Sequence, residues 1–301
     1  MRKKMWFGTI HHSQWINTPL TGADMTPQGW GTEGTYLSGG GFVRQSQDSH
    51  RTYMFEWGNA SAREDAEIMQ AYRDGVYSKK ASDLMYFVDP LMYTRNVLPR
   101  RWAQPSILLR DGVTSEPSPL GTVSPPVSPP PPEIVNDLGY PMRGVRVSSP
   151  IQSTASANLI TEPGVGSVWI PIPEGKRLVT WTRADNPGIS NSHGIRYRYL
   201  SHQGTWSTSS LIDRSGETPS FVNAKGVLLI ATGDFDFYGA RAILTEPNFS
   251  DAPADVLNWV PGMGHSGCSF VGNPTWVANS GVNGGQIGYA ATLKEVGDWH
   301  L

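Results

Sequence analysis

The sequence predicts a mainly β protein with one helix in its N-terminal part, a proline-rich linker and a C-terminal antiparallel β-sandwich of the jelly-roll type. Three observations predict this fold class. The 301 residues include 33 Gly and 24 Pro, which is typical of short strands joined by tight turns. Charged residues make up 17%, too few for a helical bundle, and aromatic residues make up 10%, which argues against wholesale disorder. Half of the sixteen residues 117–132 are proline, which marks a boundary.

The N-terminal part, residues 1–114, is predicted to be a compact mixed unit. Strands are expected at 35–37, 41–44, 53–57 and 84–88, and an extended tail at 97–109. A helix is expected over about 61–75, because Ser61 and Glu64 form a capping-box pattern and Gly75 suits a helix end. One apolar stripe runs along this helix at steps of three and four, through Ala62, Ala66, Met69, Tyr72 and Val76.

Residues 115–133 are predicted to be a linker. Proline fixes φ and lacks an amide donor, so the stretch is expected to stay out of sheets and helices and to run as a semi-rigid polyproline II spacer. A docking motif for a proline-binding groove is the alternative interpretation.

Residues 134–301 are predicted to form the sandwich. The expected strands cover 167–170, 177–181, 194–200, 226–230, 234–238, 240–244, 268–271 and 288–296. Residues 195–199 alternate with period two, so one face carries Ile and Tyr and the other carries Arg. Residues 251–301 are expected to complete the sandwich rather than return to the first unit, because 293–296 has the pattern of a core strand.

Charge, cysteine content and motifs exclude several classes of protein. The net charge is −2, with no basic stripe of the kind that binds nucleic acid. The apolar run at the N-terminus is too short for a secretory signal, and the longest apolar run, 227–231, is too short to span a bilayer. We therefore expect a soluble protein without membrane insertion. Cys268 is the single cysteine, so no intrachain disulfide is possible, and no cofactor fingerprint is present.

Residues 264–268 (GHSGC) resemble the G-x-S-x-G nucleophile elbow, with Cys in the last position. An elbow needs a strand before it and a helix after it, whereas 269–272 has the pattern of a strand. Cys268 beside His265 also suggests a Cys–His pair. We favour a turn of small residues that leads into a strand, with Cys268 as a small buried hydrophobe, and we expect no catalytic residue.

Metal binding is not expected. His11, His12 and His50 lack a third ligand at a diagnostic spacing. The acidic residues Asp234, Asp236 and Asp251 match no EF-hand loop, although a structural Ca²⁺ in a sandwich loop is an alternative.

Aromatic residues of the predicted sandwich are the remaining signal. Rings flanked by polar groups suit sugars, because pyranose C–H faces stack on rings and hydroxyls need hydrogen-bond partners. Trp181, Tyr199 and Trp206 are the candidate carbohydrate-binding residues. The competing interpretation is that these rings fill a core that is short of Leu and Ile.

Two sets of segments resemble minor tail proteins of long-tailed phages that infect actinobacteria. The first comprises 36–44 (YLSGGGFVR), 49–57 (SHRTYMFEW), 86–90 (YFVDP), 95–99 (RNVLP) and 102–105 (WAQP). The second comprises 262–270 (GMGHSGCSF) and 290–299 (AATLKEVGDW).

The resemblance implies a virion component at the tail tip, made and assembled in the host cytoplasm. It implies that residues 1–114 are similar to the ring-forming domain of distal tail proteins and that the sandwich is similar to their carbohydrate-binding-like modules. The expected partners are copies of the chain itself, other tail proteins and, for the sandwich, host-envelope glycan. It carries over no catalytic residue and no cofactor. A stand-alone glycan-binding module is the alternative function, followed by an esterase at Ser266 or a cell-wall hydrolase.

Overall fold

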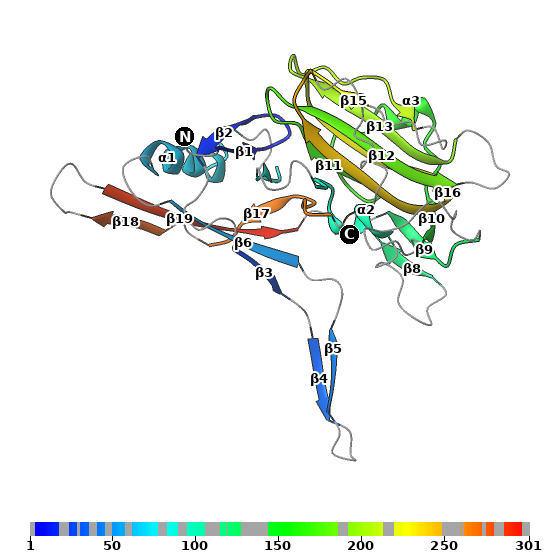
Figure 1. Ribbon diagram of the computed structural model, residues 1–301, viewed down its shortest axis with the longest axis horizontal. Coiled ribbons are helices and arrows are strands. Elements are labelled where there is room, and N and C mark those ends of the chain that lie inside the picture. The colour runs from blue at the N-terminus through cyan, green and yellow to red at the C-terminus, as the bar shows by residue number, and fades with distance from the viewer. Residues whose placement is uncertain are drawn as a thin grey trace.

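A computed structural model of the chain describes residues 4–17, 24–28, 31–35, 41–45, 50–57, 62–77, 83–89, 95–105, 115–118, 120–127, 144–185, 192–212, 220–248, 260, 262–272, 275–279 and 286–296. The structure is 52% strand and 11% helix, so the prediction of a mainly β protein is confirmed. Several antiparallel sheets account for the strands (Figure 1).

Three of the sheets are built from the two ends of the chain. One joins β2 (Ser13–Asn17), β1 (Lys4–Gly8) and β7 (Tyr86–Val88). The five-stranded sheet has the order β17 (Cys268–Phe270), β19 (Gln286–Glu295), β6 (His50–Trp57), β3 (Asp24–Gln28), and β18 (Thr275–Asn279) also pairs with β19. The third joins β4 (Gly31–Thr35) to β5 (Gly41–Gln45).

The fourth sheet has nine strands and is built from the middle of the chain. Its strands are β8 (Glu116–Ser118), β9 (Gly121–Ser124), β10 (Val145–Ser149), β11 (Ser167–Pro171), β12 (Arg177–Asp185), β13 (Gly194–Ser201), β14 (Ser210–Leu211), β15 (Ser220–Phe221) and β16 (Ala224–Thr245). The described helices are α1 (Ala62–Arg73), α2 (Arg100–Ala103) and α3 (Thr154–Ala157).

The 22-residue strand β16 organises the nine-stranded sheet. Its first half pairs with β11 and β13, and its second half pairs with β10 and β12. The sequence predicted three separate strands here, which is wrong, because the ladder continues through both glycines that separate them. Gly233 has a φ of 67° and a Cβ added to it would lie 2.4 Å from the His193 ring, so this position requires glycine.

Helix α1 matches its prediction. Ala66, Met69 and Tyr72 are buried on one stripe, and Gly75 follows the helix with a φ of 75°. Val76 is exposed because the helix ends at Arg73, so its place in the stripe is wrong. The proposed cap, Ser61, lies outside the described residues.

The predicted linker is wrong over its first half. Strands β8 and β9 lie within it, pair with each other, and join the nine-stranded sheet through β10. Pro117 is accommodated because β8 is the edge strand, where a missing amide donor breaks no ladder. The proline run at 129–132 lies outside the described residues.

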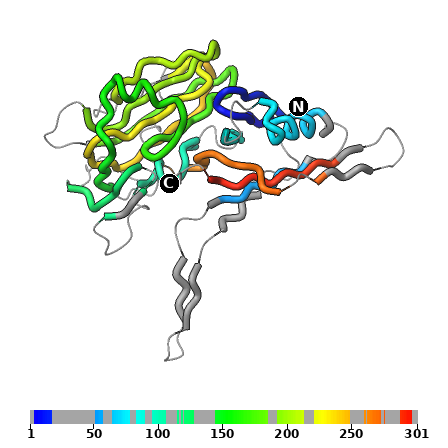
Figure 2. The backbone as a smooth tube through the Cα atoms, turned by 180° about the vertical axis from the view of Figure 1, so that it is seen from behind, coloured from blue at the N-terminus to red at the C-terminus, as the bar shows by residue number. Residues whose placement is uncertain are grey.

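The expectation that residues 251–301 complete the sandwich is also wrong. Strand β19 pairs with β6 of the N-terminal part, with Leu293 opposite Tyr53, and lies inside the five-stranded sheet (Figures 1 and 2). Leu293 is fully buried, so a core strand was correctly predicted, but its sheet was not. The last three strands therefore pair outside the nine-stranded sheet.

Asn96 joins the middle of the chain to both ends. Its side-chain Nδ2 donates to Ala240 O and Val260 O, each at 3.1 Å, and its Oδ1 accepts from the amides of Leu98 and Ala242 at 3.2 and 3.1 Å. All four hydrogen-bonding positions of this fully buried amide are thus used.

Candidate binding surface

The three aromatic candidates do not form one surface. Trp181 lies on β12, is 5% exposed, and packs in a cluster with Val179, Tyr238 and Ile243. A buried indole offers no free face to a sugar, so Trp181 fills the core, as the competing interpretation predicted.

Trp206 is half-buried and is also used internally. Its ring meets Trp169 edge to face, with centroids 5.8 Å apart. The Arg198 guanidinium lies 5.0 Å from its centroid, a cation–π distance. The ring therefore packs inside a layered stack on one face of β13.

Tyr199 is the one accessible candidate of the three. It lies on β13, is 40% exposed, and its ring centroid is 6.1 Å from that of Phe221. Val222, next in the chain to Phe221, is also exposed. Tyr199 thus presents an accessible ring beside the buried Phe221, and its sequence position could not separate it from the buried rings.

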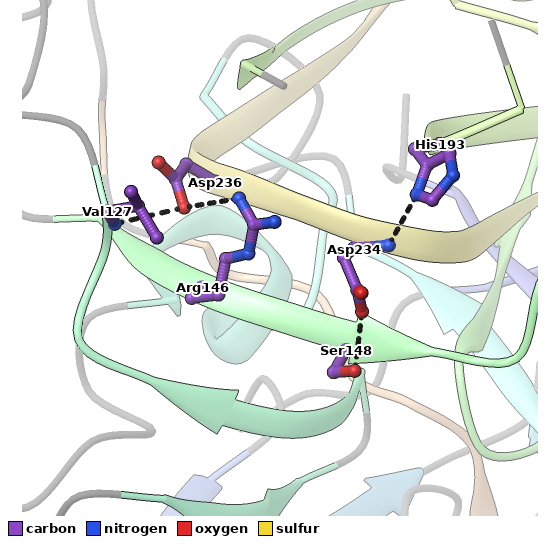
Figure 3. Close-up of polar contacts among 6 residues, drawn as sticks. All are labelled: Val127, Arg146, Ser148, His193, Asp234 and Asp236. Atoms are coloured by element: carbon purple, nitrogen blue, oxygen red, sulfur yellow. Dashed lines mark hydrogen bonds and ion pairs between the residues drawn. The ribbon is translucent and has the colours of Figure 1, made fainter. Parts of the chain in front are cut away.

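The acidic residues of β16 are engaged by neighbouring strands (Figure 3). Asp236 accepts from Arg146 Nη1 and from the Val127 amide, each at 3.3 Å, and Asp234 accepts from Ser148 Oγ at 2.5 Å. The Asp234 amide donates to His193 Nδ1 at 2.8 Å. The guanidinium of Arg146 beside Asp236 disfavours a cation there, so the Ca²⁺ alternative gains no support. Asp251 lies outside the described residues.

The GHSGC segment is buried where β17 meets β7. His265 Nε2 lies 3.1 Å from both the amide nitrogen and the carbonyl oxygen of Phe87, and His265 Nδ1 lies 3.5 Å from Cys268 Sγ. Burial lowers the pKa of His265 to about 4 and raises the pKa of the Cys268 thiol. The pair is therefore a neutral imidazole beside a neutral thiol at pH 7, and the thiolate is the nucleophilic form.

Ser266 is 2% exposed, and both its amide and its hydroxyl donate to Glu295 Oε1, at 2.9 and 3.1 Å. A strand, β17, follows the segment where an elbow would need a helix. The prediction of a turn that leads into a strand, with a buried Cys268, is confirmed.

Of the N-terminal histidines, His12 makes contacts within the fold, and the side chain of His50 lies outside the described residues. The His12 ring stacks on Tyr77, with centroids 4.2 Å apart, and its Nδ1 lies 2.8 Å from Tyr72 Oη. Burial, and then the charge of Lys225, lower the pKa of His12. Nowhere in the described part of the chain do three His, Cys, Asp or Glu side chains come together as a metal site.

Two features of the surface were not predicted from the sequence. A groove of about 290 Å³ is lined by apolar Ile10, Leu84, Tyr86 and Pro163 and by polar His11, Asp83 and Glu162. Around α3, three large apolar side chains, Ile151, Leu159 and Val165, are 60–81% exposed. Exposed apolar side chains grouped on one segment are typical of a protein contact surface. The short helix had no sequence signal strong enough to predict it.

Among the described helices, none combines the length and hydropathy needed to cross a membrane. No protein-family model, curated protein or solved structure matches the chain.

Proposed function

We propose that the protein is a structural subunit of a phage tail tip, a minor tail protein that forms homo-oligomers and docks on neighbouring tail proteins. In this proposal the sheets built from the chain ends are the distal-tail-like docking body. The nine-stranded sheet is the outward, carbohydrate-binding-like sandwich of jelly-roll type.

The observation that carries the proposal is that the two sets of segments behind the resemblance meet in space. The amide of Met263 donates to Asn96 O at 2.9 Å, and the amide of Gly264 donates to Leu98 O at 3.0 Å. Strand β19 from the second set pairs with β6 from the first. Segments separated by more than half of the chain thus form one folded body, which supports treating both sets as parts of one docking domain.

The exposed apolar side chains around α3 offer a second contact surface, on the nine-stranded sheet, through which copies of the chain associate in addition to the docking body. Leu159 is 81% exposed, and burying such a side chain in an interface contributes about 1.5–3 kcal/mol. A self-complementary or ring-closing contact repeats that gain in every subunit.

Size-exclusion chromatography with light scattering tests the proposal. We expect an oligomer whose mass falls in Leu159→Glu, because a buried carboxylate opposes association. Val127→Glu, at an exposed apolar position beside the nine-stranded sheet but outside the segment that contains α3, serves as the matched control and should keep the wild-type mass. A chain that stays monomeric and also binds no tail protein contradicts the proposal.

Glycan contact by the sandwich is a second function, favoured by the exposure of Tyr199. One ring stacked on a sugar contributes on the order of 1 kcal/mol, so several copies would act together. Tyr199→Ala should weaken binding to host cell-wall material about fivefold per site, whereas Val271→Ala, another exposed apolar position, should not. Unchanged binding by Tyr199→Ala refutes this second function.

The proposed role is architectural and assigns no reaction to the chain. Hydrolysis of a cell-wall or ester substrate by the purified protein, lost in Ser266→Ala, would overturn it.

A further inference from the structure

Strand β13 carries two arginines on the face of the nine-stranded sheet that α3 covers. Arg196 is 7% exposed and Arg198 is 4% exposed. Their alternation with Ile195 and Tyr197 was predicted, but a face carrying Arg would ordinarily point to solvent. Two guanidinium groups that are buried this close together need hydrogen-bond acceptors or anions to offset the loss of water.

Arg198 is compensated by neutral acceptors. Its Nε donates to Ser207 O at 2.9 Å, and its Nη1 donates to Ile160 O at 2.6 Å and to Ala157 O at 3.5 Å. Ala157 ends α3 and Ile160 follows it, so two of these bonds hold the α3 segment on the sheet, while Ser207 belongs to the connection between β13 and β14.

Arg196 is not compensated in this way. Within the described part of the chain, its hydrogen bond runs from Nη1 to Thr154 Oγ1 at 3.5 Å, the outer limit for such a bond, and its Nε is buried with no partner among those residues. Burial lowers the pKa of Arg196. A guanidinium at this depth without an anion is strongly unfavourable, and its five donors fit an oxyanion in bidentate fashion.

We infer that Arg196 and Thr154 form a binding site for one small oxyanion, a phosphate or carboxylate group. Thr154 is exposed at the rim, so its hydroxyl can donate to an anion that arrives from solvent. Arg198 adds a second positive charge two residues along the same face. The Ser153 and Ser156 hydroxyls lie 2.9 Å apart and bond to each other, so they are not needed for the site.

Thermal unfolding with inorganic phosphate tests the site. The wild-type protein is titrated with sodium phosphate against sodium chloride at constant ionic strength and pH. At a phosphate concentration ten times the dissociation constant, we expect Tm to rise by about 2 °C. Arg196→Met should unfold at or above the wild-type Tm without phosphate, because it removes an uncompensated charge, and it should lose the phosphate response. A merely structural arginine would instead lower Tm when replaced.

Thr154→Val provides a second test that does not depend on the stability of Arg196→Met, because Thr154 is exposed and its replacement should leave the fold intact. It should weaken phosphate binding at least threefold, whereas Thr122→Val, an exposed threonine on β9, should not. A sugar phosphate and glucuronate are titrated in parallel. A stronger response to either assigns the site to an acidic glycan, and a response to inorganic phosphate alone assigns it to the free anion. No response in the wild-type protein, or a response of Arg196→Met or Thr154→Val equal to that of the wild type, overturns the inference.

Discussion

Replacing Asn96 by alanine should destabilise the whole molecule, because this one side chain joins three segments. It bonds to β16, to its own strand-like segment at Leu98, and to Val260 near the C-terminal strands. Alanine removes both donors and both acceptor positions and leaves three buried backbone groups and the partly buried Val260 carbonyl without that partner.

The magnitude follows from the count of bonds. Each intramolecular hydrogen bond contributes about 1 kcal/mol net, so the loss of four costs about 4 kcal/mol. Unfolding entropy is about 2.1 cal/mol/K per residue, or about 0.6 kcal/mol/K for 301 residues. The expected fall in Tm is therefore about 6 °C.

Differential scanning calorimetry measures the change, with Asn158→Ala as the matched control. Asn158 is half-buried, and its Oδ1 accepts a hydrogen bond from the Ser209 amide at 2.6 Å. Its loss should cost about 1 kcal/mol and lower Tm by about 2 °C. Equal shifts for the two variants, or a fall below 2 °C for Asn96→Ala, would refute the reasoning that the network acts through all four bonds.

Three further predictions concern buried groups. His265 has a folded pKa of about 4 against an ordinary value of 6.5, so between these pH values only the unfolded chain binds the proton. The free energy of unfolding should therefore fall by roughly 3 kcal/mol as pH drops from 6.5 to 4. Urea titrations followed by tryptophan fluorescence measure this slope, and His265→Gln should flatten it. An equally steep slope in the variant would assign it to other groups. Cys268 is fully buried with a raised thiol pKa, so a thiol reagent at pH 8 should modify it only after urea unfolding, and rapid labelling of the native protein would contradict the burial. Gly233→Ala should lower the free energy of unfolding by about 1–2 kcal/mol more than Gly75→Ala does. Both glycines have a positive φ, but only at Gly233 would the added Cβ lie 2.4 Å from a ring, that of His193. Equal losses of stability would show that the backbone conformation alone matters.

Local elements were predicted well because their signals are local. The spacing of Ala66, Met69 and Tyr72 fixes one face of α1 whatever it packs against. Period-two alternation likewise assigned Ile195 and Tyr197 to one face of β13 and the two arginines to the other. The burial of Cys268 followed from its place in a short strand.

The candidate surface was predicted only in part. The sequence proposed three rings, and the structure leaves Tyr199 accessible while it places Trp181 in the core and Trp206 in an internal stack. Aromatic residues serve cores and surfaces equally well, so composition could not separate them.

The sequence by itself determined that this is a β-rich chain with one long helix, and which side chains share a face of each strand. Only the tertiary structure decided that β19 pairs with β6, that β16 runs unbroken through Gly233, and that the arginine face of β13 lies under α3. The physical reason is that alternation states which residues point together. Strand partners and the cover of each face depend on hydrogen bonds and packing between residues far apart in the chain.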